Sequence, residues 1–336
     1  MTAGLPGLTG IKAAAIGLLT PQYRAFAERL DHSLNIEQVL TKLRRIAAIA
    51  EGAERVSQFT SQEARGLDVA LCASIVASVA EPPGSIDAFR SLAIWAAGAR
   101  YKLPIEVFTT NYDTLIERGL EEEGVSYFDG FVGTLKARFR EDLVDVPDID
   151  PESIPPAGFT RLWKLHGSIN WQLESHNERR SVFRLGAPVQ TGAAAAIYPS
   201  DEKYDDSRRV PFVVLMDRFR HGLALPESCT LICGYSFGDQ HLNDVIYDAA
   251  KRFPRSEIIA ACFHEIPVDL ASRAEIYRNI LVLSPNEAII GGIRANWAAD
   301  NVAAGIFEGG RFLLGDFRRL ALFLTGSRLA PTSANA

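Results

Sequence analysis

The fold is decided by the stretch Val107-Phe108-Thr109-Thr110-Asn111-Tyr112-Asp113. Its apolar, β-branched start is typical of a buried inner strand, and the small polar residues that follow are typical of a sharp turn. Thr114 and Glu117 have the spacing of a capping box, which predicts that a helix begins directly after the turn. Asn111 and Asp113 therefore follow the carboxyl end of a strand, where open α/β sheets bind their ligands. The structural alternative is that Asp113 caps the helix and Asn111 completes the turn.

Two later stretches also place a glycine and polar residues just past an apolar run. They are Leu162-Trp163-Lys164-Leu165-His166-Gly167-Ser168 and Leu231-Ile232-Cys233-Gly234-Tyr235-Ser236-Phe237-Gly238-Asp239. Ser236 and Asp239 have capping-box spacing at the start of an amphipathic helix. Strands are predicted at 161–165, 228–233, 257–263 and 279–283, and helices at 114–122, 214–223, 239–252 and 267–277. This alternation predicts an α/β fold with a doubly wound, Rossmann-like parallel sheet.

The first hundred residues predict helices. Proline suits the first helical position, so Thr20-Pro21 marks one start, and Asn35 is expected to cap the next helix. Two more helices are predicted at about 61–80 and 87–100, and these four helices are expected to cover the nucleotide fold. We predict one domain over 1–336, with a helical subdomain at 13–103, a Rossmann-like core at 104–290 and a helical C-terminal extension at 291–336.

Two stretches inside the core predict surface structure. The acidic, proline-containing run 142–158 is typical of a loop, and its carboxylates indicate a solvated face rather than a metal site. Residues 174–208 are charged and irregular, so we expect no regular elements there. A helix is predicted near the end of the chain, at about 315–325.

Composition excludes several classes of protein. Of the 336 residues, 47% are hydrophobic and 23% are charged, which is ordinary globular composition, and the net charge of -6 does not favour direct binding to nucleic acid. No apolar run is long enough to cross a bilayer, and no signal peptide is evident. The four cysteines form no C-x-x-C pair, which indicates neither a zinc site nor a disulfide framework and fits a reducing, cytoplasmic compartment.

Taken together, the three strand ends resemble the sirtuin family, and more narrowly the sirtuin-like (SIR2-like) NAD-cleaving domains of prokaryotic anti-phage defence. Thr109 to Asp113 is similar to the family's T-x-N-x-D turn, Leu165-His166-Gly167 to its L-H-G element, and Gly234-Tyr235-Ser236 to its G-x-S strand end. Met1-Thr2-Ala3-Gly4-Leu5-Pro6 resembles the stretch that follows the family's first glycine turn. The similarity extends from Thr2 to about Leu283.

The resemblance implies a role for each matching residue. Asn111 would lie against the nicotinamide ribose and position an attacking water, and His166 would be the general base at the ribose. A histidine suits this role because its ordinary pKa is near neutrality. The structural alternative for His166 is a half-buried ring satisfied by the backbone. The remaining residues that would contact NAD are Ala3, Gly4, Thr110, Asp113 (at the carboxamide), Gly234, Ser236 (at the phosphates and ribose) and His264, with Glu265, near the adenosine half.

The chain departs from the family pattern in two ways. Deacetylating sirtuins carry two C-x-x-C pairs that hold zinc, whereas this sequence has none, so we expect no zinc and no protein deacetylation. The family also opens with a buried strand that ends in a glycine-rich, diphosphate-binding turn. The sequence begins just after the corresponding point, and we expect that the native protein supplies this strand from additional upstream residues.

The resemblance favours an NAD glycohydrolase that yields ADP-ribose and nicotinamide as the effector of an anti-phage system. Such domains are held in assemblies and released by a partner, so a homo-oligomer and a helicase-like ATPase or Argonaute-type partner are expected. The alternatives are a non-catalytic module that binds NAD or ADP-ribose and, third, a protein deacylase. The sequence leaves NAD and NADP unresolved as substrates.

Overall fold

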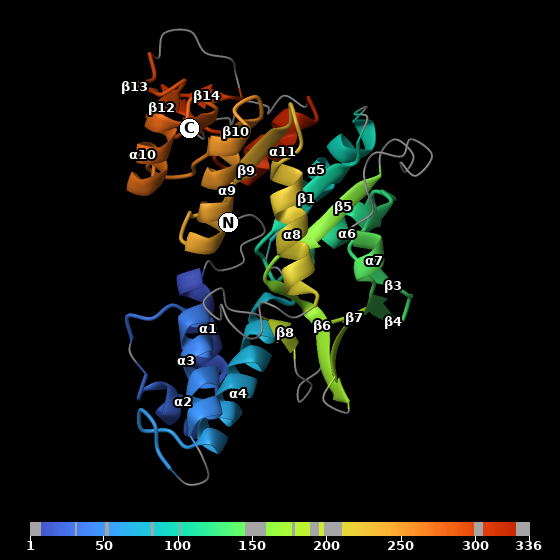
Figure 1. The fold of residues 1–336 in the computed structure, drawn as a ribbon, viewed down its shortest axis with the longest axis vertical. Helices are drawn as coiled ribbons and strands as arrows, with labels where there is room; N and C mark the ends of the chain where they lie inside the picture. The colour runs from blue at the N-terminus through green and yellow to red at the C-terminus, as the bar shows by residue number, and fades with distance from the viewer. Residues whose placement is uncertain are drawn as a thin grey trace, which may run out of the picture.

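The computed structural model describes residues 8–30, 32–50, 54–81, 84–99, 101, 103–144, 159–176, 179–188, 195–197, 210–298 and 305–326. Eleven helices and fifteen strands in these ranges confirm the mixed α/β class. Helices α1 to α4 gather at one end of the molecule, and most of the strands lie toward the other (Figure 1). The predicted ligand residues Ala3 and Gly4, and the acidic residues 145–158, lie outside the described residues.

The helices at this end begin at capping residues that can be recognised in the sequence. The Asn35 side chain accepts a hydrogen bond from the Gln38 N–H at 2.9 Å, and the Gln38 side chain accepts one from the Asn35 N–H at 3.0 Å. Thr60 and Glu63 form a second capping box. Leu40, which is fully buried, lies in the apolar core of the bundle. The helices are α1 (Leu8–Leu18), α2 (Pro21–Ala27), α3 (Ile36–Ile49) and α4 (Ser61–Val79).

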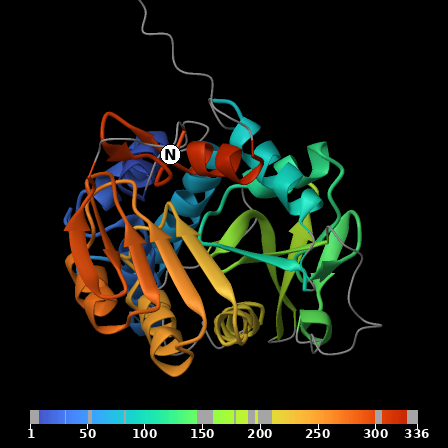
Figure 2. The same cartoon turned by 90° about the horizontal axis from the view of Figure 1, so that it is seen from above.

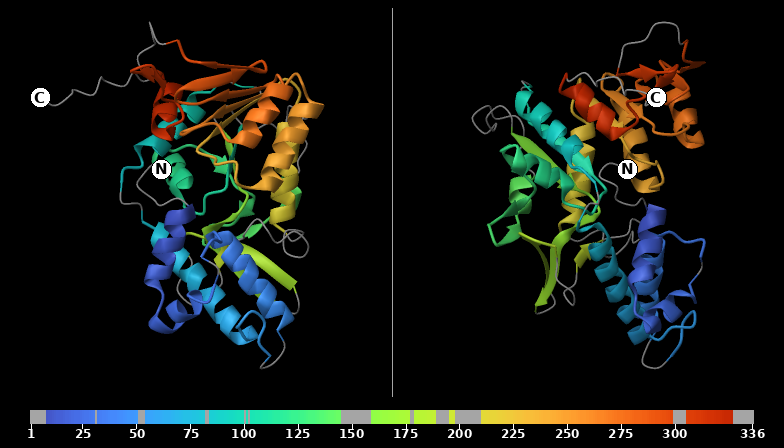
Figure 3. Two further views of the ribbon diagram at one scale, coloured as in Figure 1. Left: turned by 90° about the vertical axis from the view of Figure 1, so that its left-hand side faces the viewer. Right: turned by 180° about the vertical axis from the view of Figure 1, so that it is seen from behind.

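The next helix, α5 (Asp87–Gly98), packs against the core helices α6 (Leu115–Glu122) and α11 (Phe317–Leu324). Gly119 of α6 makes this close approach possible, since a Cβ there would lie 2.6 Å from the Phe89 carbonyl carbon. The rings of Phe89 and Phe317 are 5.2 Å apart. Figure 3 shows α11 (red) alongside α5 (teal), so the last described helix is packed against a helix from the first hundred residues.

The central stretch forms the first sheet as predicted. Strand β1 (Ile105–Thr109) pairs in parallel with β5 (Thr160–Lys164), which pairs in parallel with β2 (Tyr127–Phe128). Thr109 is the register partner of Lys164. The carboxyl ends of β1 and β5 therefore coincide, and the first two motifs meet at one edge of the sheet.

The predicted strands and helices after residue 210 are also present. Strands β9 (Cys229–Cys233), β10 (Glu257–Ala261) and β11 (Ile280–Leu283) are parallel, with Cys233 opposite Ala261. The sheet continues with antiparallel β12 (Glu287–Ile290) and β13 (Ile293–Asn296), which the periodicity did not predict. The alternating helices are α8 (Phe212–Leu223), α9 (Gln240–Arg252) and α10 (Val268–Ile276).

The parallel strands form two sheets that lie on opposite sides of the molecule in Figure 2. Among the described strands, β1 pairs only with β5 and β9 pairs only with β10, so each leaves one edge open. The arrangement is compatible with a Rossmann-like fold, although the described strands form two parallel groups and not the one doubly wound sheet that was predicted.

The expectation that residues 174–208 lack regular structure is wrong for the described part. Long strands β6 (Gly167–His176) and β7 (Arg179–Leu185) form an antiparallel hairpin in a five-stranded sheet. Charged residues hide this hairpin in the sequence because they occur on both of its faces, with Glu174 opposite Ser181 and Arg184 opposite Trp171. The other strands of this sheet are β3 (Phe131–Val132), β4 (Lys136–Phe139) and β8 (Ala195–Ile197), and the short helix α7 (Glu141–Val144) follows β4.

The end of the described chain contains a hairpin as well as the predicted helix. Strands β14 (Phe307–Glu308) and β15 (Arg311–Phe312) pair before α11 begins. A Cβ on Gly315 would lie 2.1 Å from the Cys262 carbonyl oxygen, so only glycine permits this segment to pack so closely against the end of β10. The C-terminal segment therefore belongs to the wall around the strand ends.

Candidate active site

A buried lysine, Lys164, holds the turn after β1 in place. The Lys164 ammonium, at the end of β5, donates to the carbonyl of Asp113 and pairs with the Glu117 carboxylate at 3.0 Å. The side chains of Lys164 and Glu117 are only 2% and 9% exposed. A buried charge is stable only when it is paired and hydrogen-bonded. This pair therefore fixes the turn to the first sheet.

The predicted capping box at the start of α6 is wrong. Thr114 is the N-cap residue but makes no side-chain capping bond. The Asp113 carboxylate accepts from the Leu115 N–H at 3.0 Å instead. Glu117, which was predicted to belong to the capping box, pairs with Lys164 instead. Leaving the buried Lys164 ammonium unpaired would cost more free energy than losing the capping hydrogen bond.

The second motif is hydrogen-bonded directly onto the first. The Leu165 N–H donates to the Thr109 carbonyl at 2.9 Å, and the Ile169 N–H donates to the Tyr112 carbonyl at 2.9 Å. The Ser168 hydroxyl donates to the same Tyr112 carbonyl at 3.2 Å. His166 and the turn therefore occupy fixed positions relative to one another.

The His166 ring lies between two carboxylates from distant parts of the chain. Its Nε2 is 3.1 Å from Oδ2 of Asp239, at the start of α9, and its Nδ1 is 3.4 Å from Oε1 of Glu37, in the first turn of α3. The second contact is an ion pair without hydrogen-bond geometry. Each of the three side chains is 9% exposed. The hydroxyl of Tyr112 donates to Glu37 at 2.7 Å and completes the cluster.

This setting changes the protonation of the histidine. Burial opposes the charged ring, but the hydrogen bond to Asp239 and the contact with Glu37 favour it, and together they raise the pKa of His166 from 6.5 to about 9. Burial also acts against the Asp239 carboxylate, but His166 and the N–H of His241 hold the pKa of Asp239 below its usual value. At neutral pH the pair is an imidazolium and a carboxylate. His166 is thus held by side chains and not by the backbone.

The third motif forms a tight loop before α9. The Tyr235 hydroxyl donates to the Asp239 carbonyl at 3.0 Å and to the Asn243 side chain at 2.8 Å, and the Asn243 amide donates to the Phe237 carbonyl at 2.8 Å. Phe237 adopts a φ of 56°, a conformation that is uncommon for residues other than glycine. The predicted capping box of Ser236 and Asp239 is wrong, because Asp239 itself is the N-cap and accepts from the His241 N–H.

The predicted ligand residues divide into two groups. The first group comes from the first two motifs, which are hydrogen-bonded to each other and carry the half-buried Asp113 and the buried His166. Asn111 is exposed on this turn, where its N–H donates to the Thr109 hydroxyl at 3.1 Å, and Thr110 is half-buried next to it. Exposed residues at the ends of β9 and β10 form the second group: Gly234, Ser236, His264 and Glu265. These positions by themselves assign no ligand-binding function to the residues.

Backbone at the end of β9 is open to a ligand. Gly234 has a φ of 71°, and a Cβ added to it would meet no atom within 4 Å. His264, by contrast, packs its ring against Phe263 at 4.8 Å between centroids. Because β9 and β10 are parallel and in register at Cys233 and Ala261, both residues follow the same edge of the second sheet.

Four residues at the site were not assigned roles from the sequence: Glu37, Tyr112, Lys164 and Asn243. Tyr112 and Lys164 stand inside the motifs, so their positions, though not their functions, could have been found. Glu37 carries no such signal. The Asn35 cap predicts the helix start, but nothing local indicates that the second helical residue reaches a histidine 129 positions later.

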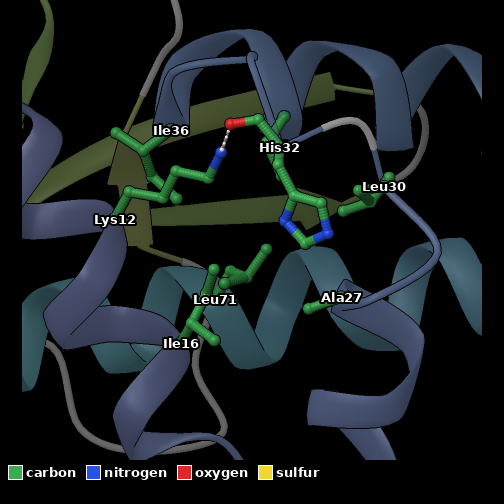
Figure 4. Close-up of a pocket in the computed structure, with 8 residues that line it drawn as sticks. Lys12, Ile16, Ala27, Leu30, His32, Ile36 and Leu71 are labelled. Atoms are coloured by element: carbon green, nitrogen blue, oxygen red, sulfur yellow. Dashed lines mark hydrogen bonds between the residues drawn. The ribbon is translucent and has the colours of Figure 1, made fainter.

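A small hollow lies apart from these strand ends, inside the helical bundle (Figure 4). The Lys12 ammonium donates to the His32 carbonyl at 2.9 Å and to the Leu34 carbonyl. The rest of the lining consists of His32 and of aliphatic residues from α1 to α4 and the segment after α2, with Ile36 and Leu71 facing the space. Lys12 thus fastens the loop before α3 to α1.

A sequence comparison identifies the family to which these motifs belong. The family model described as SIR2-like domain matches residues 105–279, more than half of the chain, and it spans all three motifs. The chain belongs to the SIR2-like family. Membership indicates an NAD-related function, because SIR2-like domains bind NAD, and it confirms the sirtuin resemblance. No curated protein gives a significant match to the chain. The match begins at β1, so Glu37 lies outside it.

All four cysteines of this SIR2-like chain are free thiols. Within the described ranges, no three histidine, cysteine or acidic side chains are placed to hold a metal ion, and no helix is long and apolar enough to cross a membrane. The absence of zinc stays a prediction.

Proposed function

We propose that the chain is an NAD glycohydrolase. Water would add to the anomeric carbon of the nicotinamide ribose as the bond to nicotinamide breaks, and nicotinamide would leave with the bonding electron pair. The products are ADP-ribose, nicotinamide and one proton, which a base must accept. We assign the base to His166 and the positioning of ribose and water to Asn111, with Asp113 at the carboxamide.

The observation that carries this proposal is the place of His166. It is a buried histidine that contacts the third motif of a SIR2-like domain through Asp239, and its own motif is hydrogen-bonded to the turn that carries the exposed Asn111. The transition state of glycosidic cleavage is oxocarbenium-like, so a neutral amide and a base suit it. The neighbouring carboxylates Glu37 and Asp239 would also favour positive charge at the ribose. The open backbone at Gly234 supports binding of the phosphates there.

NAD turnover by the purified chain tests the proposal. We expect nicotinamide release in proportion to NAD consumed, reduced about 10²–10⁴-fold by His166→Ala, the range for loss of a positioned base. We expect a comparable loss in Asn111→Ala. The matched controls are His221→Ala on α8 and Asn296→Ala on β13, both exposed and outside the site, and both should retain activity. Turnover that survives in His166→Ala would contradict the assignment.

A second candidate, a non-catalytic NAD-binding module, is favoured by one observation. With a pKa of about 9, the ring of His166 is uncharged in on the order of 1% of molecules at pH 7. A base that is already protonated is silent until its environment changes. Binding of NAD in calorimetry without turnover at any pH up to 9.5 would support the module. Turnover only with an acylated peptide would support a deacylase.

We further propose that the activity serves anti-phage defence in a homo-oligomer controlled by a partner, such as a helicase-like ATPase or an Argonaute-type subunit. The protonated His166 supports a resting state that a partner must relieve. Cells that express the chain with its neighbouring genes should lose NAD after phage infection, and cells with His166→Ala should not. Unchanged NAD in both would contradict the defence role.

A further inference from the structure

Glu37 is an acidic residue that the family match does not cover, yet it reaches the centre of the site. It belongs to α3 in the helical bundle, and its side chain is 9% exposed. Its Oε1 lies 3.4 Å from His166 Nδ1 and accepts from the Tyr112 hydroxyl at 2.7 Å. A carboxylate is costly to bury without such partners, so the bundle is built to present it there.

The position of Glu37 is set by its own helix. The reciprocal bonds of Asn35 and Gln38 fix the first turn of α3, and an acidic residue in that turn is favoured by the helix dipole. Neighbouring apolar residues Ile36 and Val39 are buried in the bundle. The carboxylate is therefore held by a rigid helix and by the turn after β1 together.

The opposite side of the ring, where Nε2 is hydrogen-bonded to Asp239, lies next to a more accessible loop. Asp239 follows a loop in which Gly234, Ser236 and Gly238 are exposed, and Phe237 has a positive φ. A ligand that enters at this loop can take the place of Asp239 at Nε2. No comparable opening lies at Nδ1 among the described residues, where Glu37 and Tyr112 are both buried.

We infer that Glu37 is a positioning residue for the proposed hydrolysis: it holds Nδ1 of His166 so that Nε2 is the atom offered to the substrate. This inference rests on the proposed function. In the reaction, Nε2 first loses its proton to solvent and separates from Asp239, and it then accepts the proton released when water adds to the ribose. Throughout, the Glu37 carboxylate faces Nδ1, from which it lies 3.4 Å away. Glu37 stabilises the resulting imidazolium. Carboxylates orient catalytic histidines in this way in other hydrolases.

Several charged groups surround the histidine and bear on its titration. Glu37 faces it from α3, Asp239 from the start of α9, and Tyr112 from the turn after β1. Behind Tyr112 lie Arg44 of α3 and Cys72 of α4, and Tyr235 contacts the backbone of Asp239. Glu37 can be neutralised with little change of shape as Glu37→Gln, which tests the carboxylate at Nδ1 and leaves Asp239 in place.

The test is a histidine-selective NMR titration of the full chain without NAD, joined to the pH dependence of NAD turnover. The chain has six histidines, and the His166 signal is identified by its loss in His166→Gln. In Glu37→Gln we expect the His166 midpoint to fall by at least about one pH unit. We expect kcat to fall about tenfold or more, less than in His166→Ala, and the rising limb of the pH–rate profile to move to lower pH with little change in KM.

Two variants separate this role from a merely structural one. Asp68→Asn removes a half-buried carboxylate of the bundle, one that pairs with Arg44 at 3.0 Å, and it should leave the His166 midpoint and the pH–rate limb unchanged. Tyr112→Phe keeps the Glu37 charge while removing its hydroxyl partner, so the midpoint should not fall. A fall in Tyr112→Phe as large as in Glu37→Gln, or a midpoint in Glu37→Gln equal to that of the wild type, would overturn the inference.

Failure of the two proposals is distinguishable. If the wild type never cleaves NAD, the proposed function fails, while the NMR midpoints still report whether Glu37 controls His166. If the wild type cleaves NAD and Glu37→Gln matches it in kcat and pH profile, the hydrolase stands and the role of Glu37 is overturned.

Discussion

The two sets of parallel strand ends differ in the burial of the residues that follow them. At β1 and β5 the side chains are buried and paired: Lys164 with Glu117, and His166 with Glu37 and Asp239. Behind them, Glu106 in β1 is bound by Arg218 of α8 and by Arg161 at 3.2 Å. At β9 and β10, Gly234, Ser236 and His264 are exposed.

The difference shows that the ends of β1 and β5 are rigid, whereas the ends of β9 and β10 are accessible. A reacting group must be held in one geometry, so the histidine is surrounded by partners that were desolvated during folding. A cofactor must enter and leave, so the backbone that would receive it is left accessible. Asp239 links the two regions, because it caps α9 and also contacts His166.

The largest effect is expected when a buried ion pair at the ends of β1 and β5 is removed. Lys164→Ala would leave the Glu117 carboxylate buried without its partner, and we expect the free energy of unfolding to fall by about 3–5 kcal/mol. Urea denaturation followed by circular dichroism measures this. The control is Lys136→Ala, whose pair with Glu174 is 2.7 Å long but exposed, and it should cost less than about 1 kcal/mol. Equal losses in the two variants would contradict the comparison.

A smaller effect is expected from pH. The pKa of His166 is about 9 in the folded chain, above its ordinary 6.5, so the folded state binds this proton more tightly. Its stabilisation is complete below about pH 6.5 and is lost as the pH rises through 9, by up to about 3 kcal/mol. Urea midpoints at pH 6, 7, 8 and 9 measure the decline. His166→Gln should flatten it, and a wild-type slope in that variant would assign the decline to other groups.

The smallest effect sharpens the description of the accessible side. Gly234→Ala would place a side chain at a φ of 71° in open space, so we expect only the backbone penalty of about 1–2 kcal/mol and a weaker affinity for NAD in calorimetry. Gly186→Ala is the control, since its added Cβ also meets nothing and its φ is not positive. NAD affinity unchanged in Gly234→Ala would show that the ligand does not approach this backbone.

Much of the fold follows from short-range patterns. Helical periodicity and caps placed α2 to α5 and α8 to α11 within a few residues, and β-branched runs placed β1, β5, β9, β10 and β11. The predictions failed where local pattern and tertiary demand compete. Thr114 and Glu117 had capping-box spacing, but Lys164 claimed Glu117. The β6–β7 hairpin was missed because charged residues on both of its faces hide the strand periodicity.

The sequence by itself determined that three glycine- and polar-ended strands of a SIR2-like domain are present, with Asn111, Asp113 and His166 at their ends, because strand and turn signals act over a few residues. Only the tertiary structure decided how those ends are joined. It brought Glu37 from the bundle and Asp239 from α9 to opposite sides of one imidazole. The physical reason is that a buried charge must find a partner wherever the packed chain provides one, and no local pattern records which partner that is.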